Sequence, residues 1–243
     1  RTGNNKDFTT VEDEIVSRME PDGYLDPDIK SWDIRFSNLC NLKCRSCGGV
    51  YSSTWAQEDA EHGSTVTNIT GKISSTTIGI DPLEKQYENV EKIYFAGGEP
   101  LIMPEHFTTL RKLIESGRSK HVKLVYNTNM TKLNYKNNNL VDLWKEFKLV
   151  RFHYSIDSIK EMNDYIRYPS KWSRQEEVFH LLDTQTSNNV EVTIAAAIQA
   201  LNVYYLPDFI QWKLEQKFKK INMWPFGAGG ISQHFVYWPA HLN

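Results

Sequence analysis

The sequence of 243 residues has only three cysteines, Cys40, Cys44 and Cys47, and they lie close together in one stretch. An odd number of cysteines this close together cannot form a set of internal disulfides, and the first residues show no secretory signal. The sequence therefore excludes a disulfide-rich secreted domain. We expect a reducing, cytoplasmic compartment, because exposed clustered thiols survive there.

The sequence also lacks a strong charge imbalance and long apolar runs. It has 28 basic and 30 acidic side chains and a net charge of -2. Nothing in this balance points to nucleic acid or to an anionic membrane as a partner. No apolar run approaches the length needed to cross a bilayer, so we expect a soluble protein. A hydrophobic content of 40% is enough for the core of one large α/β domain.

The three cysteines are spaced like metal ligands. A [4Fe-4S] cubane takes one thiolate for each iron, so three cysteines would leave one iron open to another ligand. A structural zinc site takes four protein ligands, and a catalytic zinc site takes three and a water. Inert buried thiols are a further alternative, because free cysteine packs like a small hydrophobic residue. The spacing favours iron–sulfur ligation over zinc, and zinc over structural cysteines.

Short runs rich in β-branched and aromatic residues alternate with segments of helical spacing. Six runs predict strands, over residues 32–36, 90–96, 121–127, 149–156, 190–198 and 220–224. Such alternation predicts parallel strands joined by right-handed crossovers. The predicted fold class is therefore α/β, and six units favour an incomplete barrel with its reactive groups at the carboxyl ends of the strands.

Two of the intervening segments have the spacing of amphipathic helices. Phe107, Leu110, Leu113 and Ile114 lie on one side of the first, and Gly117 is placed to end it. Residues 140–147 give a second apolar face. We also expect a helix over residues 51–60, just after the cysteines.

The second predicted strand runs directly into Gly97, Gly98, Glu99 and Pro100. Two glycines let the backbone turn tightly and approach a ligand closely, and the Glu99 carboxylate could bind an ammonium group. An ordinary glycine–proline turn is the alternative interpretation for such a short motif taken alone.

The cysteine triplet, followed by a strand that ends in Gly-Gly-Glu-Pro, resembles the radical S-adenosylmethionine (radical SAM) superfamily. The resemblance implies a partial (β/α)6 barrel with parallel strands and a [4Fe-4S] cluster held by Cys40, Cys44 and Cys47. It also implies that S-adenosylmethionine chelates the fourth iron, with its ammonium group at Gly97, Gly98 and Glu99.

A narrower resemblance, to the SPASM and twitch subgroup of that superfamily, follows the fourth predicted strand. Ser155-Ile156-Asp157 and the run from Asn163 to Tyr168 are similar to its Ser-Ile-Asp and Asn-Asp-x-Ile-Arg segments, and Asn202 also fits. The resemblance implies that Arg167 and Ser155 hold the cofactor carboxylate, which suits a guanidinium fork, and that Asp157 faces ribose or substrate. Without it, a surface salt bridge and a strand-end cap would explain Arg167 and Ser155.

The sequence departs from these relatives at three points. Ser46 stands where many members have an aromatic residue near the adenine. Met130 stands where relatives commonly have glycine, and because methionine does not freely take a positive φ, we expect a different local turn. No cysteine follows Cys47, so the cysteine-rich domain of SPASM proteins is not found in this sequence.

The predicted function is that of a radical SAM enzyme. It would cleave S-adenosylmethionine reductively at the cluster and make a 5′-deoxyadenosyl radical for hydrogen abstraction, from a peptide or protein substrate. A small-molecule enzyme of the deazaguanine synthase or molybdenum-cofactor cyclase type is one alternative. A non-catalytic, metal-stabilised binding module is another. The expected partners are a substrate and a one-electron donor.

The expected domain organisation has three parts. Residues 1–31 form an N-terminal extension, residues 32–226 form the core barrel, and residues 227–243 form a C-terminal segment that is cut short. The first residue is arginine rather than methionine, and we expect the chain to be a segment of a longer protein.

Overall fold

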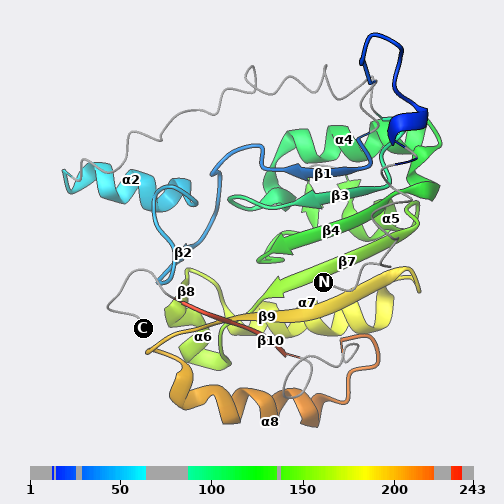
Figure 1. Ribbon diagram of the computed structural model, residues 1–243. Coiled ribbons are helices and arrows are strands. Elements are labelled where there is room, and N and C mark those ends of the chain that lie inside the picture. The colour runs from blue at the N-terminus through cyan, green and yellow to red at the C-terminus, as the bar shows by residue number, and fades with distance from the viewer. Residues whose placement is uncertain are drawn as a thin grey trace.

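The computed structural model of the chain describes residues 13, 15–25, 29–63, 87–135, 138–221 and 231–236. Its centre is a six-stranded sheet in which all neighbouring strands are parallel (Figure 1). In spatial order the strands are β1 (Ser31–Ile34), β3 (Lys92–Phe95), β4 (Lys123–Thr128), β7 (Leu149–Ser155), β9 (Val190–Ile198) and β10 (Ile231–Phe235). The predicted α/β fold, a partial barrel of parallel strands, is confirmed.

The sixth strand does not lie where the sequence pattern placed it. Lys220 and Ile221 form a turn after α8, residues 222–224 lie outside the described residues, and the last strand of the sheet is β10. The pattern was misleading because Ile221 is apolar and fully buried in the core without being a strand residue. β10 has polar residues at three of its five positions, so it lacks a strong strand signal.

The helices pack against one face of the sheet and bury it. They are α4 (Pro104–Glu115), α5 (Leu140–Trp144), α6 (Lys160–Ile166), α7 (Trp172–Gln185) and α8 (Leu206–Gln216). Leu110 of α4, Trp144 of α5, Phe179 of α7 and Phe209 of α8 are fully buried in the core with the apolar strand residues. The predicted amphipathic segments therefore form α4 and α5, and Gly117, at φ 73°, follows the end of α4 as predicted.

Among the described residues, no helix covers the other face of the sheet, and the strands alternate accordingly. In β9 the side chains of Val190, Val192, Ile194, Ala196 and Ile198 are buried, while those between them are partly exposed. A parallel sheet covered on both faces reads as a continuous apolar run. The alternation therefore marks a face that lines a cavity rather than packing against helices.

Two small ladders lie outside the main sheet. β2 (Lys43–Cys44) pairs antiparallel with β8 (Arg167–Tyr168), and β5 (Asn134–Tyr135) pairs antiparallel with β6 (Asn138–Asn139). After β2 comes α2 (Ser53–Glu61), two residues later than the predicted start at residue 51. Among the described residues, no helix has both the length and the apolar character of a membrane span.

Candidate functional site

A cavity of about 420 Å³ lies at the carboxyl ends of the strands, and most of the predicted site residues line it. These are Cys40, Cys44, Cys47, Gly97, Gly98, Glu99, Ser155 and Arg167. Pro100 does not line this cavity but begins a buried 3₁₀ turn, and Asp157 lines a neighbouring cavity. Segments distant in the sequence therefore meet at one end of the sheet, as expected for a barrel.

Hydrogen bonds from α2 fix the backbone of the cysteine loop. The Cys40 N–H donates to the Ser53 hydroxyl at 3.1 Å, and the Trp55 indole N–H donates to the Cys44 carbonyl oxygen at 2.9 Å. Ser52 caps the helix and donates its hydroxyl to the Leu42 carbonyl oxygen at 2.7 Å. The helix that follows the cysteines thus holds their loop in shape before any ligand binds.

The three cysteines are partly exposed as residues and belong to no disulfide. Burial raises the pKa of each of them to about 11, so the free thiols are protonated at neutral pH. Metal binding would displace these protons and make cluster assembly pH-dependent. In the described part of the chain, no group of three His, Cys, Asp or Glu side chains is arranged around a single metal ion. A cubane does not need such convergence, because each thiolate binds a different iron.

Glu99 lies beside the thiols and is 1% exposed, and its carboxylate accepts three hydrogen bonds. Oε1 accepts from the Thr128 hydroxyl at 2.6 Å and from the Leu101 N–H at 3.0 Å, and Oε2 accepts from the Asn129 N–H at 2.6 Å. Burial raises the pKa of Glu99, against these hydrogen bonds. An ionised carboxylate has about four acceptor sites, so one stays available to a ligand.

Gly97 and Gly98 have positive φ values of 78° and 52°. A Cβ on Gly98 would lie 2.3 Å from the Leu39 carbonyl oxygen, and the Glu99 N–H donates to that same oxygen at 2.7 Å. The close approach expected for these glycines is therefore made to the backbone that leads into Cys40. The glycine loop and the cysteine loop are packed together as one unit.

Arg167 and Asp157 form a largely buried ion pair, with Nη1 2.9 Å from Oδ2. Burial acts to lower the pKa of Arg167, but Asp157 and Cys44, which is a thiolate at the high pH where a guanidinium titrates, outweigh it and raise that pKa. The other oxygen of Asp157, Oδ1, accepts from the Ala197 N–H at 2.8 Å. Because both carboxylate oxygens have partners within the protein, Asp157 orients the guanidinium more directly than it faces a ligand.

Asn202 closes the same corner from the end of β9. Its side-chain amide donates to the carbonyl oxygens of Asp157 at 2.7 Å and Ala197 at 2.9 Å, and its Oδ1 accepts from the Gln199 N–H at 2.8 Å. Asn202 is 2% exposed. Asn202, which fits the subgroup pattern, therefore joins the backbone at Asp157 to the backbone at the end of β9.

Met130 takes a φ of 55°, which corrects the expectation that methionine would avoid this conformation. Its N–H donates to the Thr128 hydroxyl at 3.0 Å, and its side chain is fully buried. A positive φ costs roughly 1–2 kcal/mol for a residue with a Cβ. Burial of a large apolar side chain contributes about 1.5–3 kcal/mol, which offsets that cost.

Asn129 is a site residue that the sequence analysis did not identify. Besides its backbone bond to Glu99, its side-chain Nδ2 lies 3.1 Å from the Asn41 side-chain oxygen and 4.0 Å from the Cys40 sulfur. It therefore links the glutamate to the cysteine loop. Its signal in the sequence is its place directly after a strand, at the same sheet end as the other motifs.

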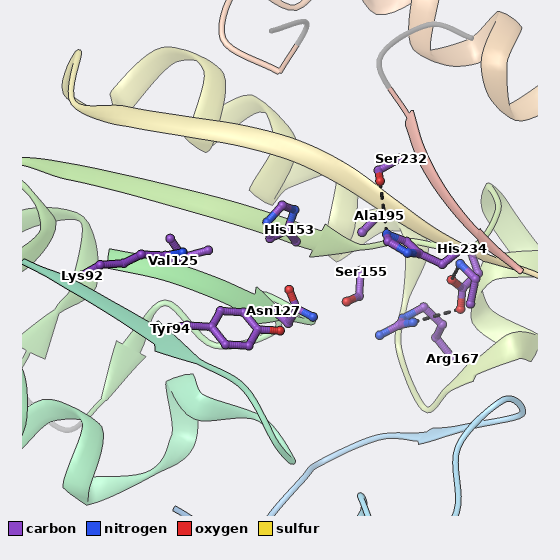
Figure 2. A pocket seen from close by; sticks show the side chains of 12 residues that line it. Lys92, Tyr94, Val125, Asn127, His153, Ser155, Arg167, Ala195, Ser232 and His234 are labelled. Atoms are coloured by element: carbon purple, nitrogen blue, oxygen red, sulfur yellow. Dashed lines mark hydrogen bonds and ion pairs between the residues drawn. The ribbon is translucent and has the colours of Figure 1, made fainter. Parts of the chain in front are cut away.

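A second cavity, of about 550 Å³, lies in front of the open face of the sheet (Figure 2). Tyr94, Asn127, Ser155 and Arg167 line both cavities, so the two spaces adjoin. The remaining lining residues are Lys92, Val125, His153, Asp157, Ala195, Ala197, Ser232 and His234. The polar residues among them interrupt otherwise apolar strands, and this alternation is the signal that could have identified the cavity from the sequence.

A family model described as the Radical SAM superfamily matches residues 34–196. The matched segment contains all three cysteines, residues 97–100, Ser155, Asp157 and Arg167. The comparison with curated proteins gives no match.

Solved structures of SuiB from Streptococcus suis are similar to this chain. The structure of SuiB bound to the precursor peptide SuiA has a TM-score of 0.52 and 16% sequence identity, covering 99% of this chain and 47% of SuiB. A further SuiB structure has a TM-score of 0.50 and 15% identity, covering 96% of this chain and 49% of that one. SuiB bound to S-adenosylmethionine gives 0.49 and 14%, with coverages of 93% and 49%. The chain spans about half the length of these proteins, and the likeness concerns the fold.

Proposed function

The chain belongs to the radical SAM superfamily, and from that premise we propose that it modifies a peptide or protein substrate. The family implies a [4Fe-4S] cluster and S-adenosylmethionine as cofactors. When bound, they supply radical chemistry, in which one electron cleaves the cofactor and a hydrogen atom is taken from the substrate. The observation that carries the proposal is the meeting of three thiols, Glu99 and Arg167 around one cavity.

The residues of the first cavity suit these cofactors. Cys40, Cys44 and Cys47 would hold three irons and leave the fourth open. Glu99, with the backbone of Gly97 and Gly98, would receive the ammonium group of the methionine moiety, because it offers a free acceptor site on a buried carboxylate. Arg167 would bind the carboxylate of that moiety, with Ser155 beside it.

Asp157 keeps the Arg167 guanidinium turned toward the cavity, and the ladder between β2 and β8 keeps Arg167 beside Cys44. Fixed positions of this kind orient a ligand without reorganisation when it binds. The adjoining second cavity would admit the substrate from the open face of the sheet and exclude bulk water once it is filled.

A peptide substrate is supported by two observations. The Ser155-Ile156-Asp157 segment and the run ending in Arg167 and Tyr168 resemble the SPASM and twitch subgroup, to which we assign the chain. SuiB, which shares the fold, has been crystallised with its precursor peptide. The small-molecule alternatives lack a comparable observation. We further propose a cytoplasmic location, because clustered thiols and an iron–sulfur cluster need reducing surroundings.

Anaerobic reconstitution tests the enzymatic proposal. We expect about four irons and four sulfides per chain, and 5′-deoxyadenosine release when S-adenosylmethionine and dithionite are added. Cys44→Ala should lose both, whereas Arg45→Ala, a neighbour that stacks on Tyr165, should retain both. One zinc per chain and no release would support the binding module instead.

The substrate class needs its own measurement. We expect 5′-deoxyadenosine release to rise when the reconstituted protein receives the low-mass fraction of a cell extract, and to fall back when that fraction is first digested with a broad protease. Stimulation that survives the digestion would favour a small-molecule substrate.

A further inference from the structure

The second cavity has an excess of positive charge on its walls. Lys92 enters it from the start of β3, and its exposed side chain forms no ion pair or hydrogen bond with the part of the chain that the structure describes. The other charged lining residues, Arg167 and Asp157, neutralise each other. Next to the cavity in the sheet register, Arg151 is likewise paired with Glu191, with 2.7 Å between Nη2 and the carboxylate.

His153 lies on the same wall, one strand beyond β4. Neither of its ring nitrogens has a hydrogen-bond partner among the described residues. Burial lowers the pKa of His153, and the positive charges of Arg151 and Lys92 lower it further. Its imidazole is therefore neutral at pH 7 and offers one N–H donor to a ligand. His234, by contrast, already lies 3.1 Å from the Ser232 hydroxyl.

The view into the cavity supports a shared subsite. Figure 2 shows Lys92 at one end of the space and Arg167 at the other, with Tyr94, Asn127 and His153 between them, and His153 is the register partner of Asn127. Lys92 is close enough to His153 to influence its pKa. A ligand that spans the cavity would thus meet the Lys92 ammonium group at the end remote from the cysteines and the His153 imidazole farther along the wall, neither of which is paired with a described residue.

We propose that Lys92 and His153 form a subsite for a carboxylate group of the substrate. This inference rests on the proposed function and adds the substrate class, a peptide that carries an aspartate or glutamate near the modified residue. A charge-assisted hydrogen bond from Lys92 and a neutral one from His153 would hold the carboxylate. A phosphate group fits less well, because phosphate sites use backbone N–H groups in nests or at helix ends. The backbone of these strands is engaged in the parallel ladder.

A pair of matched peptides tests the subsite. N-acetylated, C-amidated Gly-Gly-Glu-Gly-Gly and its glutamine counterpart are titrated into the full chain, reconstituted with iron and sulfide and saturated with S-adenosylmethionine. Affinity is followed by calorimetry, and the His153 ring is followed by its Cε1 resonance in histidine-labelled protein. We expect the glutamate peptide to bind at least about tenfold more tightly than the glutamine peptide and to shift the His153 resonance.

Lys92→Met should remove this preference. Lys123→Met is the matched control, because Lys123 is the register partner of Lys92 on β4 and does not line the cavity. It should retain the preference in full. His153→Gln, which keeps a donor of similar reach, should reduce the preference only partly.

Equal affinities of the wild-type protein for the two peptides overturn the subsite, and so does the absence of binding by either up to about 10 mM. A preference that survives Lys92→Met also overturns it. The proposed function fails by a different result, namely no cluster and no binding of S-adenosylmethionine in the same samples. The peptide titration does not depend on radical chemistry, so the two failures are distinguishable.

Discussion

Cys44 and Arg167 lie directly opposite each other in the antiparallel ladder between β2 and β8. Next to this pair, the Arg45 N–H donates to the Ile166 carbonyl oxygen at 2.8 Å. Main-chain hydrogen bonds therefore fix the distance between a proposed cluster ligand and the proposed ligand of the cofactor carboxylate. Such a connection gives the site its geometry before either cofactor is present.

Gly98→Ala should weaken the cysteine loop without changing any ligand. The new Cβ would lie 2.3 Å from the Leu39 carbonyl oxygen at a φ of 52°. We expect a loss of about 2–5 kcal/mol in unfolding free energy, because the strain of the positive φ and the overpacking add. Iron content after reconstitution should fall as well.

The control for this substitution is Gly117→Ala. Gly117 has a φ of 73°, but a Cβ there would meet nothing within 4 Å. It should lose only about 1–2 kcal/mol and retain its iron. If both variants assemble the cluster equally well, the contact between Gly98 and Leu39 has no role in shaping the cysteine loop.

The contrast between these glycines shows which part of the site could be predicted from the sequence. The motif at residues 97–100 predicted a tight turn beside the cysteines, and the turn is there. Its reason could not be read from the sequence, because the contact between Gly98 and Leu39 joins residues far apart in the chain. Local patterns report backbone conformation, whereas close approaches depend on tertiary packing.

Met130 and β10 are two features that local sequence patterns predicted wrongly, because tertiary packing determines them. The steric rule for positive φ holds for Met130 in isolation, but its buried side chain and its bond to Thr128 stabilise the turn. In β10 the apolar pattern is weak because one face lines a polar cavity. β9 has a strong apolar pattern, and it begins and ends at the predicted residues.

Glu99→Gln should reduce both cofactor affinity and stability. The amide group would direct donor hydrogens toward a backbone N–H now bound to the carboxylate, that of Asn129 or that of Leu101. One unsatisfied buried donor costs about 1–3 kcal/mol. We expect the Kd for S-adenosylmethionine to rise by about tenfold or more, since the ammonium group would lose its ionic partner.

Thr128→Val separates the two effects. It removes the hydroxyl that donates to Glu99 and accepts from the Met130 N–H, but it leaves the carboxylate charge in place. This variant should lose stability and keep most of its affinity, as measured by urea unfolding and by calorimetry. An unchanged Kd in Glu99→Gln would assign the glutamate to loop packing alone.

Arg167→Met should destabilise the fold more than Asp157→Asn does. Without Arg167, the Asp157 carboxylate, which is 1% exposed, would keep only the Ala197 N–H, and breaking a buried pair costs about 3–5 kcal/mol. Arg167 is 12% exposed, so without Asp157 its charge can turn toward the cavity and water.

Cofactor affinity should follow the same order. Arg167→Met should lose most of its affinity for S-adenosylmethionine, and Asp157→Asn should lose part of it, because the guanidinium would no longer be oriented. Calorimetry on both variants and on the double variant measures the coupling between the two residues. Additive losses would contradict the positioning role of Asp157.

His106 introduces a pH dependence into the stability of the core. It is fully buried in α4 among Phe95, Phe107 and Tyr126, and its Nε2 lies 2.9 Å from the Tyr126 hydroxyl. Nδ1 has no partner among the described residues. Burial lowers the pKa of His106 from 6.5 to about 3, so the folded protein keeps this imidazole neutral.

Stability should therefore fall as the pH drops below 6.5, because the unfolded chain then binds a proton that the folded chain does not. At pH of about 5 the contribution is roughly 2 kcal/mol smaller than at pH of about 7.5, by the linkage relation. His106→Gln keeps a group able to bond Tyr126 but does not titrate. Urea unfolding of both proteins at the two pH values should show the loss of stability on acidification to be about 2 kcal/mol smaller in the variant. Equal losses in the two proteins would mean that the folded state accommodates a protonated His106, and that another group governs the acid sensitivity of this fold.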